Sequence, residues 1–170
     1  MRRLLITVLT AACLAAAAAS AAAAKQPLEL RLWLDKASYS ASEPIHASMA
    51  LKNTGKQPVW VNARFYMSAP TGPGNGRDGH FIVTAPSGAE LPCMVTVRAG
   101  FPKSDDFKRL EPGQEITMGS PRELRRFFDL KEPGTYVVRA VYQNAFGAEL
   151  GLDAFKGPLE SKPVMFTIIQ

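Results

Sequence analysis

Apolar and polar residues alternate with a period of two along several segments of this 170-residue chain. In the first of them, leucines at positions 28, 30, 32 and 34 alternate with Glu29, Arg31, Trp33 and Asp35. This pattern is typical of a strand with one buried face, because successive side chains of a strand point to opposite sides. Further strands are predicted at 45–52, 58–67, 81–84, 91–97, 115–118, 135–143 and 164–169.

Short turns rich in glycine and proline separate these segments, and no strand–helix–strand alternation is seen. The one helix-start signal is Ser120, followed by Pro121 at the first helical position and by Glu123, which can complete a capping box. We therefore expect one short helix over 120–127. The fold class predicted is an all-β, antiparallel sandwich of seven to eight strands.

The first 24 residues have the features of a secretory signal peptide. Arg2 and Arg3 precede a short apolar run and an alanine tract with several A-x-A sites. We expect cleavage near Ala24, a folded domain over 25–170 and a periplasmic or secreted location. Lipidation at Cys13 stays open as a less favoured alternative, since Thr10 interrupts the lipobox pattern.

Removal of the leader leaves Cys93 as the only cysteine and lowers the formal charge from +5 to +3. An internal disulfide, a cysteine-built zinc site and an internal membrane span are thereby excluded. The modest charge and the export signal argue against a nucleic-acid partner. No cofactor is expected, since Gly72–Gly76 is not followed by the features of a phosphate-binding loop.

The segment from Leu130 to Tyr136 contains Pro133 and Gly134 before a tyrosine that enters a late strand. It resembles the tyrosine corner of immunoglobulin-like sandwiches, in which the tyrosine hydroxyl bonds to the backbone upstream. Together with Tyr39, the turn at 110–113 and the strand edges, it is similar in order to secreted bacterial immunoglobulin-like domains and, distantly, to the intracellular proteinase inhibitor family. The resemblance implies an immunoglobulin-like fold with Tyr136 and Gly134 in structural roles. Ser120 is also expected to have a structural role, as the cap of the predicted helix.

Catalysis is not expected, because the exported part contains only His46 and His80 and has no nucleophile elbow. A periplasmic copper site is an alternative. A hairpin centred on Ser87 would place His80 opposite Met94, with Met67 as a third ligand, and this set suits Cu(I). A protease inhibitor is a second alternative, implied only by the resemblance.

Three aromatic side chains fall on the polar faces of predicted strands: Trp33, Trp60 and Tyr66, the last two beside Arg64. They are candidates for a binding patch. The interpretation we favour is that the loop at 144–163 covers these aromatic side chains, through Phe146, Leu150, Leu152 and Phe155. Arg122, Arg125 and Arg126 form a basic cluster that could contact an anionic envelope surface.

The sequence thus predicts an exported, non-catalytic binding or accessory module of the bacterial cell envelope. Its partner is expected to be another protein or an envelope component, recognised by the loops at 68–79 and 144–163.

Overall fold

The computed structural model describes residues 27–69, 78–96 and 100–170. The predicted signal peptide, Cys13 and residues 70–77 of the glycine-rich loop lie outside these residues. Within the described part, the chain is built of strands and three single turns of 3-10 helix: η1 (Ser104–Asp106), η2 (Leu124–Arg126) and η3 (Ala148–Leu150). The all-β prediction is confirmed. No described helix is long and apolar enough to cross a bilayer.

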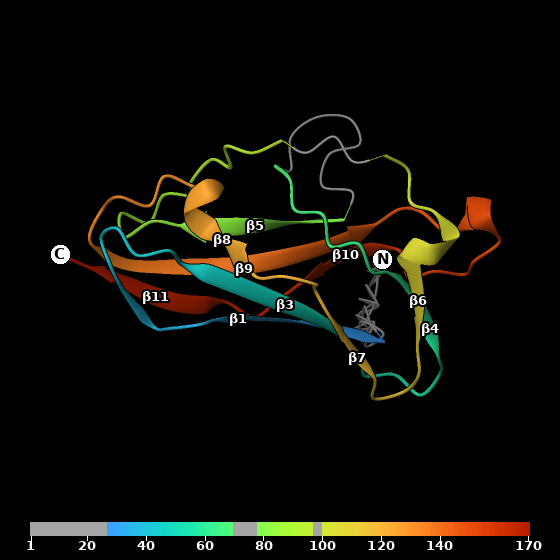
Figure 1. Ribbon diagram of the computed structural model, residues 1–170. Coiled ribbons are helices and arrows are strands. Elements are labelled where there is room, and N and C mark those ends of the chain that lie inside the picture. Colours follow the sequence, from blue (N-terminus) through green and yellow to red (C-terminus); the bar gives the residue numbers. More distant parts are fainter. Residues whose placement is uncertain (1–26, 70–77, 97–99) are drawn as a thin grey trace, which may run out of the picture.

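Two sheets form the body of the molecule, and a two-stranded ribbon lies at the end remote from the C-terminus (Figure 1). The first sheet contains β1 (Leu28–Leu34), β3 (His46–Asn53), β7 (Glu115–Thr117) and β8 (Arg122–Glu123). The second contains β2 (Ser38–Ser40), β5 (Gly79–Thr84), β9 (Gly134–Asn144), β10 (Gly157–Glu160) and β11 (Val164–Ile169). The ribbon pairs β4 (Val59–Asn62) with β6 (Phe107–Leu110).

The inward faces of the two sheets make one hydrophobic core. Leu30, Met49 and Leu51 come from the first sheet, and Val138 and Phe166 come from the second. Each is at most 3% exposed. Burial of such side chains contributes roughly 1.5–3 kcal/mol each, and this hydrophobic burial is the dominant favourable term in folding.

The tyrosine-corner hydrogen bond is present. The hydroxyl of Tyr136 donates to the carbonyl oxygen of Glu132 at 2.8 Å. Gly134 has a φ of 135°, and a Cβ atom there would lie 2.8 Å from the ring of Pro86. Only glycine satisfies both conditions, because side chains clash with the backbone at such a φ.

A strand also forms where the sequence indicated only a turn. β2 pairs in parallel with β11, and Tyr39 at its centre is 1% exposed. Its hydroxyl donates to Asp35 Oδ1 at 2.7 Å and accepts from the Lys36 N–H at 3.0 Å. Burial of the Tyr39 side chain therefore holds the three residues of β2 in place. A strand this short has no repeated alternation of apolar and polar residues, so the sequence pattern does not reveal it.

The short helix predicted over 120–127 forms only in its later part, as a single 3-10 turn, and its predicted start at Ser120 is wrong. Arg122 and Glu123 pair with β3, and the 3-10 turn begins only at Leu124. Its cap is Glu123, whose Oε1 accepts from the Arg125 N–H at 2.9 Å, so Ser120 is not the cap. The Leu124 side chain is fully buried, and its N–H bonds to the Ile45 carbonyl oxygen at 2.8 Å. Pairing with β3 therefore outweighs the local helix signal.

The predicted strand over 91–97 does not form in its described part, residues 91–96. The turn at Ser87 is correct, since Thr84 bridges Glu90 and the Leu91 N–H bonds to the Val83 carbonyl oxygen. Pro92 then offers no N–H to continue the ladder. The chain turns away, and the Met94 N–H bonds to the Phe127 carbonyl oxygen at 2.8 Å.

Candidate binding groove

A bulge interrupts the edge of the first sheet. Ala50 pairs with Thr117 and Ala47 pairs with Arg122, so four residues lie opposite two residues of β3. Bulges at sheet edges redirect side chains and block further strand pairing, and Pro121 within this one adds to the block. The bulge directs Pro121 and Arg122 to the rim of a surface groove.

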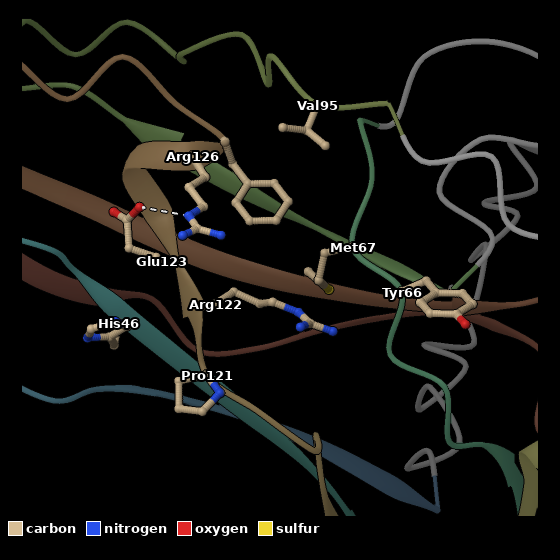
Figure 2. Close-up of a pocket in the computed structure, with 9 residues that line it drawn as sticks. His46, Tyr66, Met67, Val95, Pro121, Arg122, Glu123 and Arg126 are labelled. Atoms are coloured by element: carbon tan, nitrogen blue, oxygen red, sulfur yellow. Dashed lines mark ion pairs between the residues drawn. The ribbon is translucent and has the colours of Figure 1, made fainter.

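The groove has a volume of about 580 Å³ and is drawn in Figure 2. Its lining residues are His46, Tyr66, Met67, Val95, Pro121, Arg122, Glu123, Arg126 and Phe127. They come from β3, the segment after β4, the segment after the Ser87 turn, and β8 with η2. Four chain segments far apart in sequence therefore meet here.

The floor of the groove is apolar and anchored in the core. Met67 is 3% exposed and bridges to Gly79, the first residue of β5. Phe127 contacts Phe81 edge to face, with ring centroids 6.2 Å apart. These contacts hold the floor side chains in place before any ligand binds. Binding therefore costs little free energy for ordering these side chains.

The rim carries two arginines with different surroundings. Arg126 is exposed, and its Nε lies 3.6 Å from Glu123 Oε2. Arg122 is half-buried, and its guanidinium has no hydrogen-bond or ion-pair partner among the residues that the structure describes. Figure 2 shows this side chain extending across the hollow in the direction of Tyr66. A guanidinium without a partner on a partly apolar surface is suited to an anionic group.

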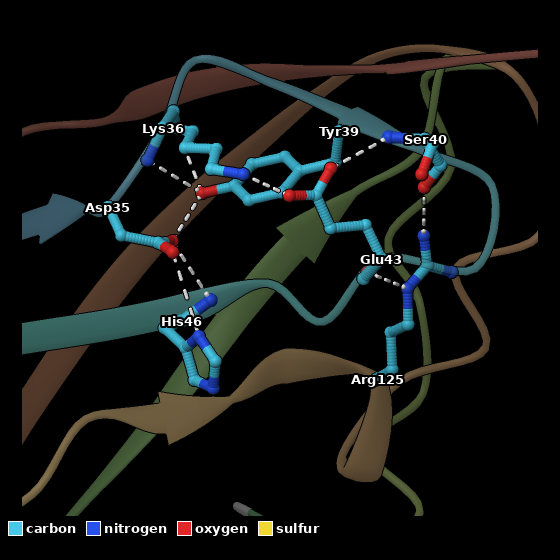
Figure 3. A network of polar contacts seen from close by, with 7 residues as sticks. All are labelled: Asp35, Lys36, Tyr39, Ser40, Glu43, His46 and Arg125. Atoms are coloured by element: carbon cyan, nitrogen blue, oxygen red, sulfur yellow. Dashed lines mark hydrogen bonds and ion pairs between the residues drawn. The ribbon is translucent and has the colours of Figure 1, made fainter.

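Arg125, the third member of the basic cluster, has a structural role (Figure 3). Its Nε donates to the Glu43 carbonyl oxygen at 2.8 Å, and its other nitrogens donate to the carbonyl oxygens of Leu130 and Ser40. The side chain thus joins the turn before β3 to η2.

Replacement of Arg125 by methionine is expected to lower the free energy of unfolding by about 1–3 kcal/mol, because hydrogen bonds to a charged group are lost. Urea unfolding checks this, with Arg122→Met as the matched control. The structural role is contradicted if the two variants lose equal stability.

His46, which lines the groove, also belongs to a polar network around Asp35 (Figure 3). His46 Nδ1 is 3.6 Å from Asp35 Oδ2, and the His46 N–H donates to Asp35 Oδ1 at 3.2 Å. Burial alone raises the pKa of Asp35, but the hydrogen bonds from the Tyr39 hydroxyl and the His46 N–H outweigh it and hold that pKa below its usual value. Asp35 is therefore ionised beside His46 at neutral pH.

The four predicted binding residues do not form one patch. Trp33 is 41% exposed on β1 and does not line the groove. Trp60 is half-buried, and its carbonyl oxygen accepts from the Phe155 N–H at 2.8 Å, so the 144–163 segment pairs with the backbone at Trp60. Arg64 is buried in an ion pair with Asp78. Only Tyr66 reaches the groove, with its ring centroid 5.1 Å from the Arg64 guanidinium carbon.

The copper hypothesis required His80 opposite Met94, and this pairing is wrong. His80 lies opposite Val141 in the β5–β9 ladder, whereas Met94 is 59% exposed beyond the hairpin. Met67 is part of the groove floor. The described residues contain no cluster of three histidine, cysteine or acidic side chains that could hold a metal ion.

The environment of His80 predicts a pH dependence of stability. Burial lowers the pKa of His80. The unfolded chain, with a histidine pKa of about 6.5, therefore takes up a proton before the folded protein does as pH falls, and folding loses stability below that value. Urea titrations between about pH 7.5 and about pH 5 should show a smaller loss in His80→Asn than in the parent. An equal loss of stability in both proteins would contradict the conclusion that burial lowers the pKa of His80.

Sequence reasoning marked the arginine cluster but missed the groove. The groove forms because the bulge and the change of chain direction at Pro92 bring Arg122 close to His46, Glu123 and Val95. The alternation of apolar and polar residues in the sequence reveals neither feature. One signal for the groove was present in the sequence. The run Gly119-Ser120-Pro121 before Arg122 fits an interrupted edge strand as well as a helix start.

No family model and no curated protein matches this chain. Among solved structures, a β-glucosidase from Erythrobacter marinus aligns with 17% identity and a TM-score of 0.32, covering 84% of this chain. The alignment spans only 15% of the glucosidase chain. A similarity at this level supports no argument about fold or activity.

Proposed function

We propose that this protein is an exported, non-catalytic binding module of the bacterial cell envelope, and that the groove beside β8 is its recognition site. The observation that supports this is an apolar floor anchored in the core below an arginine that has no partner in the described residues. Specific sites commonly combine an apolar pocket with a few placed polar groups, in volumes of about 300–1,000 Å³. The leader sequence supports the location.

Filling the groove tests this function without changing its charge. Val95→Trp and Pro121→Trp add bulk on two sides of the groove, while Met165→Trp adds the same bulk on the exposed face of β11. The purified proteins are immobilised and exposed to envelope extracts. We expect a stoichiometric component to be retained by the parent and by Met165→Trp, and lost with both groove variants. Equal retention by all four proteins would overturn the assignment.

A further inference from the structure

We propose that the groove binds a peptide segment of a partner protein, in which a single carboxylate is flanked by apolar side chains. This inference rests on the proposed function and adds the chemistry of the ligand. It follows from the charge of the rim, the nature of the floor and the size of the hollow.

The rim favours a singly charged anion. Arg122 and Arg126 contribute two positive charges, and Glu123 offsets one of them through its contact with Arg126. A carboxylate balances the remaining charge and matches the planar fork of the Arg122 guanidinium. A phosphate dianion would exceed that charge and lie near the Glu123 carboxylate, which disfavours it.

The floor favours apolar groups beside the carboxylate. Met67 and Phe127 form the apolar floor, and Val95 adds an apolar side chain from the segment after the Ser87 turn. Figure 2 shows the Tyr66 ring at one end of the hollow. A volume of about 580 Å³ accommodates two or three side chains but not a folded domain. An extended peptide presents side chains in this number while its backbone stays in water.

A membrane surface is less well matched to this region. Lipid recognition by charge uses clusters of about four to eight basic residues. Of the three neighbouring arginines, Arg125 is occupied by backbone carbonyls, and Arg126 is paired with Glu123. A single guanidinium in a hollow selects one ligand group instead of an extended charged surface.

The test uses an array of pentapeptides whose central residue is glutamate, glutamine or lysine, between leucine, phenylalanine and alanine in all combinations. The best binders are then titrated by fluorescence anisotropy against the mature protein. We expect glutamate peptides to bind roughly tenfold more tightly than their glutamine counterparts, as a charged hydrogen bond predicts. That ratio should fall to about one in Arg122→Gln and persist in Arg109→Gln, since Arg109 lies on β6 and pairs with Glu111 away from the groove lining.

Three outcomes would overturn the ligand assignment: no binder in the array, no preference for glutamate, or a preference that survives Arg122→Gln. Binding of phosphatidylglycerol vesicles that depends on Arg122, without a glutamate preference, would assign the site to lipid. In each case, the tryptophan variants still report separately on whether the groove is the recognition site. Circular dichroism of Arg122→Gln verifies that the fold is retained.

Discussion

Replacement of Asp78 by asparagine is expected to lower the free energy of unfolding by about 3–5 kcal/mol, because it leaves a buried guanidinium without a counter-ion. The Asp78 side chain is 0% exposed and that of Arg64 is 7% exposed. Arg64 Nη2 lies 2.9 Å from Asp78 Oδ1, which also accepts from Asn62 Nδ2 at 2.8 Å. The same arginine holds the Tyr66 ring in the groove wall.

Urea unfolding measures this loss, with the exposed Asp153→Asn as control. The double variant Arg64→Met/Asp78→Leu provides a second check. Asp78 Oδ2 and Arg64 Nε have no hydrogen-bond partner among the described residues, so the cost of burying both charges is not fully offset. Removal of both should therefore recover most of the stability lost in Asp78→Asn. A loss below about 1 kcal/mol in Asp78→Asn would contradict the role of the pair.

The second large effect is expected at Tyr136. Its ring is 1% exposed and stacks on Phe166, with centroids 5.2 Å apart and planes 8° from parallel. Tyr136→Ala should cost about 3–5 kcal/mol through the cavity it leaves, whereas Tyr136→Phe should cost about 1 kcal/mol through loss of the corner hydrogen bond.

Calorimetry or urea unfolding of the two Tyr136 variants separates packing from hydrogen bonding, and Tyr66→Ala serves as the exposed control. If Tyr136→Phe were as damaging as Tyr136→Ala, the corner hydrogen bond and not the ring would dominate. That result would contradict a stabilisation that comes mainly from packing of the Tyr136 ring on Phe166.

Long alternating segments could be read from the sequence because burial repeats along them. β1, β3, β9 and β11 all lie within predicted strands to within one residue at either end, and Leu28, Leu30 and Tyr136 face the core as alternation requires. The corner at Glu132–Tyr136 was also predictable, since its turn residues are local.

The rest depends on contacts between distant residues. β2 exists because Tyr39 packs on Phe166, with ring centroids 5.9 Å apart, and nothing near Tyr39 in sequence reports that partner. The bulge before β8 depends on register with β3. Arg122 and Arg125 are three residues apart, yet one faces the groove and the other bonds to carbonyls of Glu43 and Ser40. Only the folded chain distinguishes them.

The most direct test of the groove as recognition site is site-specific photocrosslinking in producing cells. A benzophenone amino acid is placed at position 95, 121 or 165 of the full-length chain, and adducts are resolved by electrophoresis after irradiation. We predict a discrete adduct of the same size from Val95 and from Pro121, and none from Met165 on the β11 face. An adduct from position 165 alone, or none from positions 95 and 121, would contradict the assignment.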